Sequence, residues 1–251
     1  MNFKAYAAYQ GSKKLYYDLE AAIAAKQKII ALWYKHIAPD AHRVEFPVLI
    51  PNGVLKKSGH IPAFNEQLFH IENNDLSLRP ETATTIMPHL KQLRAIYKGE
   101  DPLKISQIGK AFRDEKTTRD GRYRLREFDQ LQLEVLFKKQ DNLFQQYKHK
   151  VAQFFNALGL EVIYKQLQEF DRAHYSSRTI DIYAKPADMD TYLELGCLND
   201  RGNYDLYDLP AIDRDRLKIF QVSLGLDRIK NLVLLSKVKT QTTQHKKHPI
   251  P

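Results

Sequence analysis

Polar and apolar residues alternate from Arg124 to Phe137, a period that predicts a β-strand with two unlike faces. One face is apolar, and we assign it to the core: Leu125, Leu131, Leu133, Val135 and Phe137. The other face carries Arg124, Arg126, Phe128, Gln130, Gln132 and Glu134. Polar groups are costly to bury without partners, so this face is either the solvated side of an antiparallel sheet or a binding surface. The alternation favours neither.

Apolar residues at helical spacing predict helices over Ser12–His36, from Arg79-Pro80-Glu81-Thr82 onward, over Asp141–Leu158, and from Gly225 to about Leu235. Pro39 ends the first helix, Pro88 kinks or ends the second, and Gly159 can cap the third. The segment Lys57–Asn65 has no such spacing and predicts a loop.

Further strands are predicted over Val44–Ile50, Ile105–Glu115, Tyr123–Phe137, Leu160–Tyr164, Ile180–Ala184, Tyr192–Asn199 and Ile219–Leu224. Pro47 places the first of these at an edge or an interface, because proline donates no backbone hydrogen bond. Strands and helices follow one another without a regular βαβ rhythm. The pattern therefore indicates an α+β fold with a largely antiparallel sheet.

The composition narrows the class of protein. The chain has 251 residues, which suit one large domain or two small ones, and 43% are hydrophobic. The single cysteine, Cys197, excludes an internal disulfide and a cysteine-based zinc site, and it suits a reducing compartment. The net charge of +9 favours a polyanionic partner, either nucleic acid or nucleotide phosphate. No secretory signal or membrane-spanning run is visible, so we expect a cytoplasmic protein without a membrane partner.

Several short strings point to one family. They are Val44–His60 with Pro47, Pro51 and Ser58-Gly59-His60; Leu78-Arg79-Pro80-Glu81-Thr82-Ala83; Phe112–Phe128 with Arg119 and Gly121 in its loop; Tyr192–Leu206; and Ser223–Arg228. In this order they resemble the catalytic core of class II aminoacyl-tRNA synthetases, most closely glycyl-tRNA synthetase of the archaeal–eukaryotic type. The resemblance extends from about Tyr17 to Leu235.

The resemblance implies a class II synthetase-type antiparallel β-sheet flanked by helices. It implies one catalytic domain over residues 1–235 and no anticodon-binding domain. The basic, polar composition of residues 236–251 predicts a disordered tail. The family's first motif, here Val44–His60, builds its dimer interface, so the resemblance also implies a homodimer formed through Val44–Pro51.

The resemblance implies ATP as a substrate, with Mg²⁺. It assigns Arg113 to the α-phosphate and the substrate carboxylate, and Arg228 to the γ-phosphate; these two are the expected catalytic residues. It assigns Glu115 to the adenine edge, Phe128 to stacking on the adenine, Arg126 to the other side of that ring and Glu194 to the metal. Judged without the resemblance, the same residues suit surface ion pairs, a core phenylalanine and a solvated carboxylate.

At the amino-acid end, the resemblance assigns Glu81 to the substrate ammonium and Ser223 to the region of the α-carbon. Gln132 and Gln221 stand where the family has glutamates, and Val222 replaces a proline. An amide retains the shape of a glutamate but loses the charge that pairs with an ammonium, at about 1.5–3 kcal/mol for each charged hydrogen bond. We therefore expect a substrate pocket altered from that for glycine.

Two functions follow from these residues. The first is an ATP-dependent ligase that activates an amino acid or a related carboxylate and passes it to an acceptor: tRNA or a tRNA fragment, a carrier protein or a small molecule. The second is a non-catalytic, dimeric, synthetase-like subunit that binds nucleic acid or regulates another protein. Arg113, Glu115, Phe128 and Arg228 are all present, although the amino-acid pocket has changed, which favours the ligase.

Overall fold

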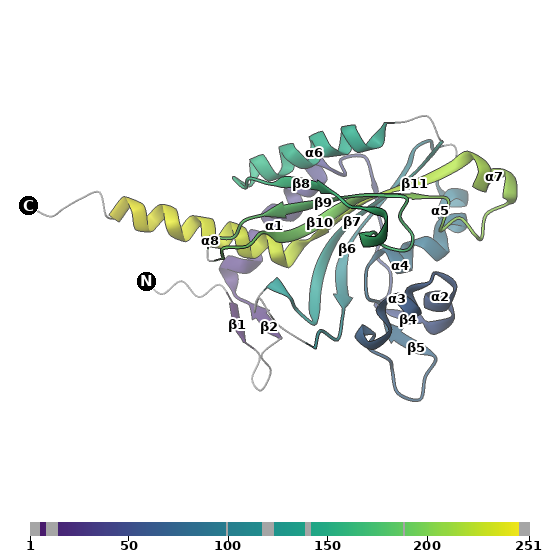
Figure 1. Ribbon diagram of the computed structural model, residues 1–251, viewed down its shortest axis with the longest axis horizontal. Helices are drawn as coiled ribbons and strands as arrows, with labels where there is room; N and C mark the ends of the chain where they lie inside the picture. The colour runs from purple at the N-terminus through teal and green to yellow at the C-terminus, as the bar shows by residue number, and fades with distance from the viewer. Residues whose placement is uncertain are drawn as a thin grey trace, which may run out of the picture.

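A seven-stranded sheet forms the centre of the computed structural model, which describes residues 6–8, 15–98, 100–116, 123–138, 142–187 and 189–245. The strands lie in the order β3 (His42–Arg43), β6 (Leu103–Phe112), β7 (Glu127–Lys138), β11 (Leu217–Gly225), β10 (Leu193–Gly202), β9 (Arg178–Ala184) and β8 (Ile163–Gln166). Only β3 and β6 are parallel; the other neighbours are antiparallel. The predicted α+β fold with a largely antiparallel sheet is confirmed (Figure 1).

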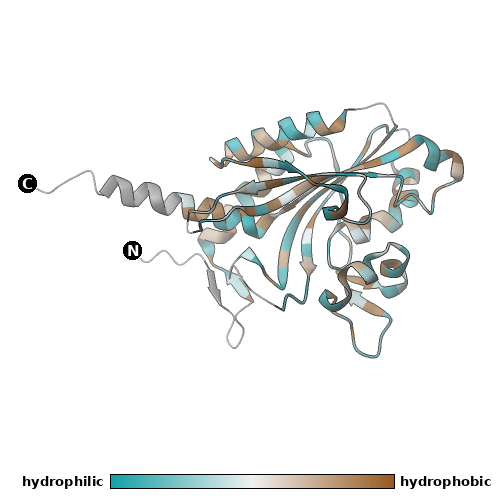
Figure 2. Ribbon diagram, viewed as in Figure 1, coloured by the Kyte–Doolittle hydropathy of each residue, from teal (hydrophilic) through white to brown (hydrophobic). Residues whose placement is uncertain are grey.

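Three long helices cover the apolar face of this sheet: α1 (Glu20–His36), α6 (Leu143–Ala157) and α8 (Leu226–His245). Trp33 of α1, Phe154 of α6 and Ile229 of α8 share one core with Leu131, Leu133 and Val135 of β7, as the alternation predicts. Polar and apolar residues lie on opposite sides of α6 (Figure 2). The helix ends before Gly159, whose φ of 71° suits the expected cap.

Smaller elements border the polar face of the sheet and the N-terminus. They are β1 (Tyr6–Ala8), β2 (Tyr16–Asp18), β4 (Leu49–Pro51), α2 (Asn52–Lys57), α3 (His60–Phe64), η1 (Asn65–Gln67), β5 (Leu76–Leu78), α4 (Ala83–Ile86), η2 (Met87–His89), α5 (Leu90–Ile96), η4 (Glu169–Asp171) and α7 (Ala211–Arg216). Strands β4 and β5 pair with each other outside the main sheet, and Ile50, Leu55 and Leu68 form a small core there. Pro88 lies between α4 and α5, where the sequence predicts a break.

Two predictions near the N-terminus were wrong. Tyr16–Asp18 is a strand that pairs with β1, so the first helix begins at Glu20; local spacing cannot reveal a pairing with residues ten positions away. The expected strand over Val44–Ile50 is a strand only at Leu49–Ile50, in β4, which joins the small sheet; β3 lies just before it and joins the main sheet. Pro47 lies between them and has no N–H for a ladder.

Two other predictions also failed. Lys57–Asn65 contains helix α3 instead of being a loop, because burial of His60 supplies stability that local spacing does not show. The last helix continues ten residues past Leu235, to His245, since no proline or glycine interrupts Ser236–His245. Residues 246–251, and with them the end of the predicted disordered tail, lie outside the described residues, as do Arg119 and Gly121.

Candidate active site

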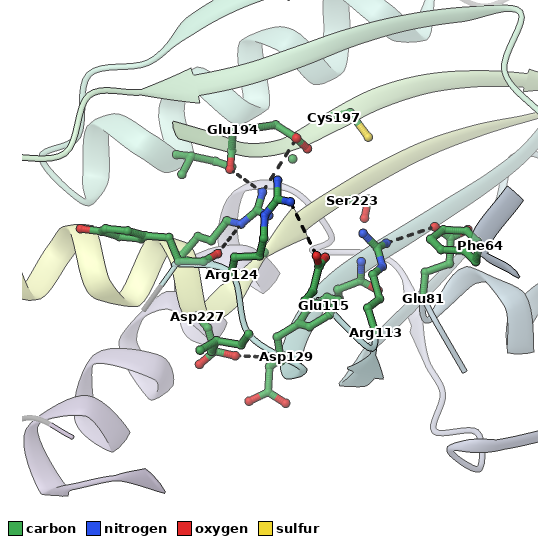
Figure 3. Close-up of a pocket in the computed structure, with 18 of the residues that line it drawn as sticks. Phe64, Glu81, Arg113, Glu115, Arg124, Asp129, Glu194, Cys197, Ser223 and Asp227 are labelled. Atoms are coloured by element: carbon green, nitrogen blue, oxygen red, sulfur yellow. Dashed lines mark hydrogen bonds and ion pairs between the residues drawn. The ribbon is translucent and has the colours of Figure 1, made fainter. Parts of the chain in front are cut away.

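One pocket lies over the polar face of β7, β10 and β11, beside the start of α8 (Figure 3). Among the residues lining it are most of those that the sequence predicts for substrate binding: Glu81, Arg113, Glu115, Phe128, Glu194, Ser223 and Arg228. Arg126, Gln132 and Gln221 do not belong to this lining. The fold therefore brings together side chains from segments that are far apart in the sequence.

Both expected catalytic arginines are held by backbone carbonyls. Arg113 Nε donates to the Pro80 carbonyl at 3.0 Å. Arg228 donates from Nε to the Tyr123 carbonyl at 3.0 Å and from a terminal nitrogen to the Glu194 carbonyl at 2.7 Å. Burial, followed by repulsion from Arg113, lowers the pKa of Arg228, although the Glu194 carboxylate opposes this. Fixed guanidinium groups of this kind suit a substrate that carries negative charge.

An aromatic surface accompanies Arg113. Its guanidinium carbon lies 4.9 Å from the centre of the Phe64 ring and 5.4 Å from that of Phe128. Phe64 was not among the predicted site residues, because it falls in the segment predicted as a loop. Arg113 is thus oriented by two rings and a carbonyl, and its remaining nitrogens are directed into the pocket (Figure 3).

The structure places Arg124 in the pocket and Arg126 outside its lining. Arg124 lies 3.6 Å from the Glu115 carboxylate, whereas Arg126 pairs with Asp114 and lies 5.0 Å from the centre of the Phe69 ring. Strand β7 begins only at Glu127, so the alternation that assigned both arginines to one face does not apply before that residue. Sequence reasoning had no signal that would separate them.

Glu194 is the carboxylate expected to hold the metal, and its side chain is 48% exposed at the pocket. Burial is the main cause that raises the pKa of Asp181 to about 6, and the negative charge of Glu194 is the second cause. Within the described residues, no group of three or more histidine, cysteine or acidic side chains could hold a metal ion. One exposed carboxylate does fit Mg²⁺ that arrives with phosphate, because that ion keeps waters and binds few protein ligands.

Glu81, the residue expected to bind a substrate ammonium, lines the pocket and is almost fully buried. Burial would raise the pKa of its carboxyl group, but the hydrogen bond from His60 and the nearby charges of His60, Arg201 and Arg113 lower it to about 2. The group is therefore a carboxylate at neutral pH. Ser223 and Cys197 also line the pocket, on neighbouring strands, in direct register with each other.

Gln132 and Gln221 lie in a buried polar row beneath the pocket, with 0% and 1% of their surfaces exposed. Both amides donate to Glu134 Oε1, at 2.6 Å and 3.1 Å, and Asn199 donates to Gln221 Oε1 at 2.7 Å. The Arg201–Asp205 ion pair, fully buried at 2.6 Å, adjoins this row. The polar face of β7 is thus not a solvated surface, and only part of its length faces the pocket.

Glu134 was not predicted as a site residue, although it shares the parity of Gln132. Burial raises the pKa of its carboxyl group to about 8; Asp205 adds to the shift and Arg201 opposes it. Its Oε2 atom is buried and has no hydrogen-bond partner in the described part of the chain. A carboxyl group in these surroundings favours its protonated form.

A network of lysines and carboxylates lies behind the pocket. Lys26 of α1 contacts Asp18 at 2.8 Å, Asp129 at 2.6 Å and Asp227 at 2.9 Å. Lys230 contacts Asp227 at 3.0 Å and also pairs with Asp18. Asp227 further accepts a hydrogen bond of 2.7 Å from the Asp129 backbone, which ties α8 to β7 directly beside Arg228. Sequence reasoning missed this network, because its members lie on four separate elements.

Residues 67–209, more than half of the chain, match the family model described as the tRNA synthetase class II core domain (G, H, P, S and T). The chain belongs to the class II tRNA synthetase core family. It is 30% identical over 176 residues to a protein named glycine–tRNA ligase from Mycoplasmopsis synoviae (strain 53), covering 62% of this chain and 38% of that protein. It is 34% identical over 175 residues to a glycine–tRNA ligase from Geobacillus thermodenitrificans (strain NG80-2), covering 62% and 37%.

Solved class II synthetases share the fold. Giardia lamblia prolyl-tRNA synthetase in complex with prolyl-adenylate superposes with a TM-score of 0.77 at 17% identity, covering 92% of this chain and 50% of that one. Prolyl-tRNA synthetase from Cryptosporidium parvum gives 0.73 at 14% identity, covering 91% and 49%. The shared fold thus extends over nearly all of this chain. The chain spans less than two fifths of the length of the two glycine–tRNA ligases named above.

Proposed function

We propose that this chain is an ATP-dependent ligase that activates an amino acid, or a related carboxylate, as its adenylate. The observation that carries the proposal is the fixed pair Arg113 and Arg228 in one pocket with the carboxylate of Glu81. The match to the class II core family supports it. The pocket thus combines groups for phosphate and for an ammonium.

In adenylate formation a carboxylate oxygen attacks the α-phosphorus of ATP, a new P–O bond forms and pyrophosphate leaves. Negative charge increases on the phosphate oxygens, and fixed guanidinium groups stabilise it more than mobile ones do. We assign Arg113 to the α-phosphate and the attacking carboxylate, and Arg228 to the γ-phosphate. Phe128 and Glu115 would hold the adenine, and Arg124, which contacts Glu115, takes the place that the sequence suggested for Arg126.

Mg²⁺ would bind through Glu194 together with the phosphates of ATP. The half-exposed side chain of Glu194 and its position on the pocket lining support this assignment. The ion would neutralise phosphate charge and help to hold ATP in position. The protein's own contribution is a single hard oxygen ligand beside the two arginines.

The amino-acid end supports a substrate pocket altered from that for glycine. Glu81 is the one carboxylate of the predicted amino-acid subsite, whereas Gln132 and Gln221 are amides that donate to Glu134. The similarity to glycine–tRNA ligases covers about two thirds of the chain and leaves glycine as the first amino acid to test. The acceptor would be tRNA, a tRNA fragment, a carrier protein or a small molecule.

Finer assignments rest on the sequence motifs. One is a glycyl enzyme of the archaeal–eukaryotic type, although the two relatives named above are bacterial. The others are a homodimer formed through Val44–Pro51 and a location in the cytoplasm. The proposed catalytic domain covers residues 1–235. No helix in the described part of the chain is both long and apolar enough to cross a membrane.

ATP–pyrophosphate exchange tests the proposal directly. We expect one or a few of the twenty amino acids or simple carboxylates to support exchange, glycine poorly, and Arg113→Ala to abolish it. Efficient exchange with glycine would contradict the altered pocket but not the ligase. No exchange with any substrate, combined with tight binding of nucleic acid, would favour the non-catalytic subunit instead.

A further inference from the structure

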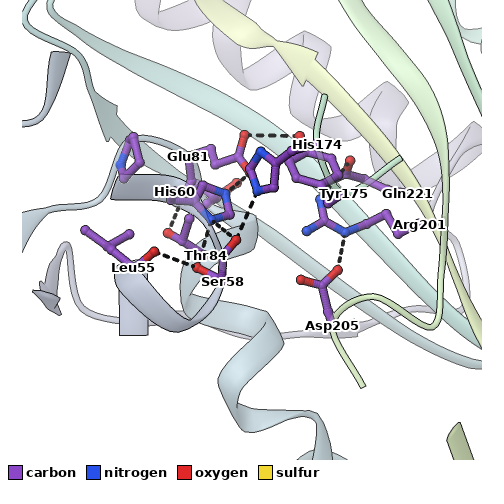
Figure 4. Close-up of polar contacts among 12 residues, drawn as sticks. Leu55, Ser58, His60, Glu81, Thr84, His174, Tyr175, Arg201, Asp205 and Gln221 are labelled. Carbon is purple, nitrogen blue, oxygen red and sulfur yellow. Dashed lines mark hydrogen bonds and ion pairs between the residues drawn. The ribbon is translucent and has the colours of Figure 1, made fainter. Parts of the chain in front are cut away.

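The string Ser58-Gly59-His60 lies beside Glu81, and His60 contacts that carboxylate directly (Figure 4). His60 is 1% exposed, and its Nε2 lies 3.0 Å from Glu81 Oε1. Its Nδ1 lies 2.8 Å from the Ser58 hydroxyl oxygen. A buried histidine thus bridges a serine and the carboxylate that faces the substrate.

The chemistry of Glu81 determines where a proton must be. A carboxylate only accepts hydrogen bonds, so Nε2 of His60 carries hydrogen and donates it to Glu81 Oε1. The Ser58 hydroxyl can donate to Nδ1 or to the Val54 carbonyl, which lies 2.9 Å away, and Nδ1 also lies 3.1 Å from the Ser58 carbonyl oxygen. The Ser58 hydroxyl can therefore donate to Nδ1 or accept from it, and in both arrangements Nε2 remains the donor to Glu81.

The surroundings hold the imidazole ring in place. It stacks on the Phe64 ring, with centres 5.8 Å apart, and on the Tyr175 ring at 5.9 Å, while His174 meets it edge-on at 5.2 Å. Gly59 adopts a φ of 71°, and a Cβ there would lie 2.8 Å from the Tyr204 hydroxyl. Glycine is thus required both by the backbone conformation and by the space.

One oxygen of Glu81 is occupied by His60, and the other is directed at the pocket. Glu81 Oε2 lies 3.5 Å from the Tyr175 hydroxyl and 3.9 Å from Arg113. These longer contacts leave capacity for a substrate ammonium, which binds best to a carboxylate already fixed in direction.

We propose that His60 is a positioning residue that donates from Nε2 to Glu81 and turns the second carboxylate oxygen toward the substrate ammonium. This inference rests on the proposed function. It extends to Ser58 and Gly59, which set the orientation of His60 from the end of α2.

Two variants, His60→Gln and His60→Asn, distinguish the role of Nε2 from that of Nδ1, because each amide resembles part of the imidazole ring in size. Glutamine at position 60 presents an N–H close to the position of Nε2, whereas asparagine presents one close to Nδ1 and cannot reach Glu81. We expect His60→Asn to raise the amino-acid KM in pyrophosphate exchange by about tenfold to a hundredfold, with the ATP KM changed less than about twofold. His60→Gln should restore most of the loss. His70→Asn is the matched control, because His70 contacts Ser77 outside the pocket.

A pH profile distinguishes positioning from general loss of structure. Besides His60, the groups that face Glu81 are Arg113, Arg201, Tyr175, His174 and Cys197. Without the His60 hydrogen bond the pKa of Glu81 should rise, because burial then dominates. The amino-acid KM of His60→Asn should therefore increase from pH 7.5 to 5.5 more steeply than that of the wild type.

A nitrogen NMR spectrum of the histidine-labelled wild type tests the hydrogen bond without catalysis, with His60 assigned from the His60→Gln variant. We expect hydrogen on Nε2 and a change of its signal in Glu81→Gln. This result does not depend on whether any amino acid supports exchange, so a failure of this inference can be distinguished from a failure of the proposed function. A bare Nε2, an unchanged amino-acid KM in His60→Asn, or equal losses in His60→Gln and His60→Asn would each overturn the proposal.

Discussion

Gln221 donates a 3.1 Å hydrogen bond to Glu134 across the β11–β7 pair. Gln132, on the same strand as Glu134, donates to the same oxygen at 2.6 Å. The two amides therefore solvate a buried carboxyl group beneath the pocket. Two more carboxylates at these positions would crowd Glu134, whose pKa burial already raises.

This arrangement predicts how stability depends on pH. The pKa of Glu134 is raised to about 8 in the folded chain, against about 4.3 for an unperturbed glutamate. The folded state thus binds more protons, and the free energy of unfolding should fall as pH rises between these two values, by at most about 1.4 kcal/mol per pH unit. Denaturant unfolding of Glu134→Gln should lack this part of the slope. Equal slopes in both proteins would show that Glu134 ionises normally.

Nucleotide affinity should depend on Arg113, Phe128 and Arg228. Each arginine change to alanine removes a charge-assisted contact, and Phe128→Ala removes the adenine platform, so each should weaken ATP binding by about tenfold or more. Calorimetry with ATP and Mg²⁺ measures this. Arg216→Ala on α7, where the side chain is exposed and outside the pocket, serves as the control. Undiminished affinity in the Arg113 and Phe128 variants would remove the basis for the site.

Lys26 should stabilise the pocket from behind, because it pairs with three carboxylates. Lys26→Met leaves these charges without their shared partner and should lower the free energy of unfolding by about 3 kcal/mol. ATP affinity should also fall, since Asp227 adjoins Arg228. Lys28→Met, on the exposed side of the same helix, should change stability by less than about 0.5 kcal/mol. Comparable thermal unfolding of the two variants would argue against the network.

The proposed homodimer can be tested at Leu49, which is 45% exposed on β4 within the expected interface. Sedimentation at micromolar concentration should give a dimer for the wild type and a monomer for Leu49→Asp. Ile212→Asp, at a 60% exposed position on α7, should remain a dimer. A monodisperse wild-type monomer would refute the assembly, and a dimeric Leu49→Asp would place the interface elsewhere.

Much of the fold follows from local patterns. The apolar parity of β7 and the stripe on α6 correctly identify the core, because a strand or helix with one apolar side must bury it. The resemblance to class II synthetases assigns Arg113, Glu115, Phe128 and Arg228 to one site, and in the structure all four line one pocket. That resemblance is visible in the sequence because each of its motifs is a short continuous segment.

The second face of β7 was decided only by tertiary structure. Gln130, Gln132 and Glu134 are 7%, 0% and 1% exposed, and residues distant in sequence contact them: Thr82 bonds Gln130 and Gln132, and Gln221 bonds Glu134. The bridge from His60 to Glu81 and the pairing of Lys26 with Asp227 also join separate elements. A linear pattern carries the polarity of each residue but not the distances across strands, and those distances determine which polar groups bind substrate and which support one another.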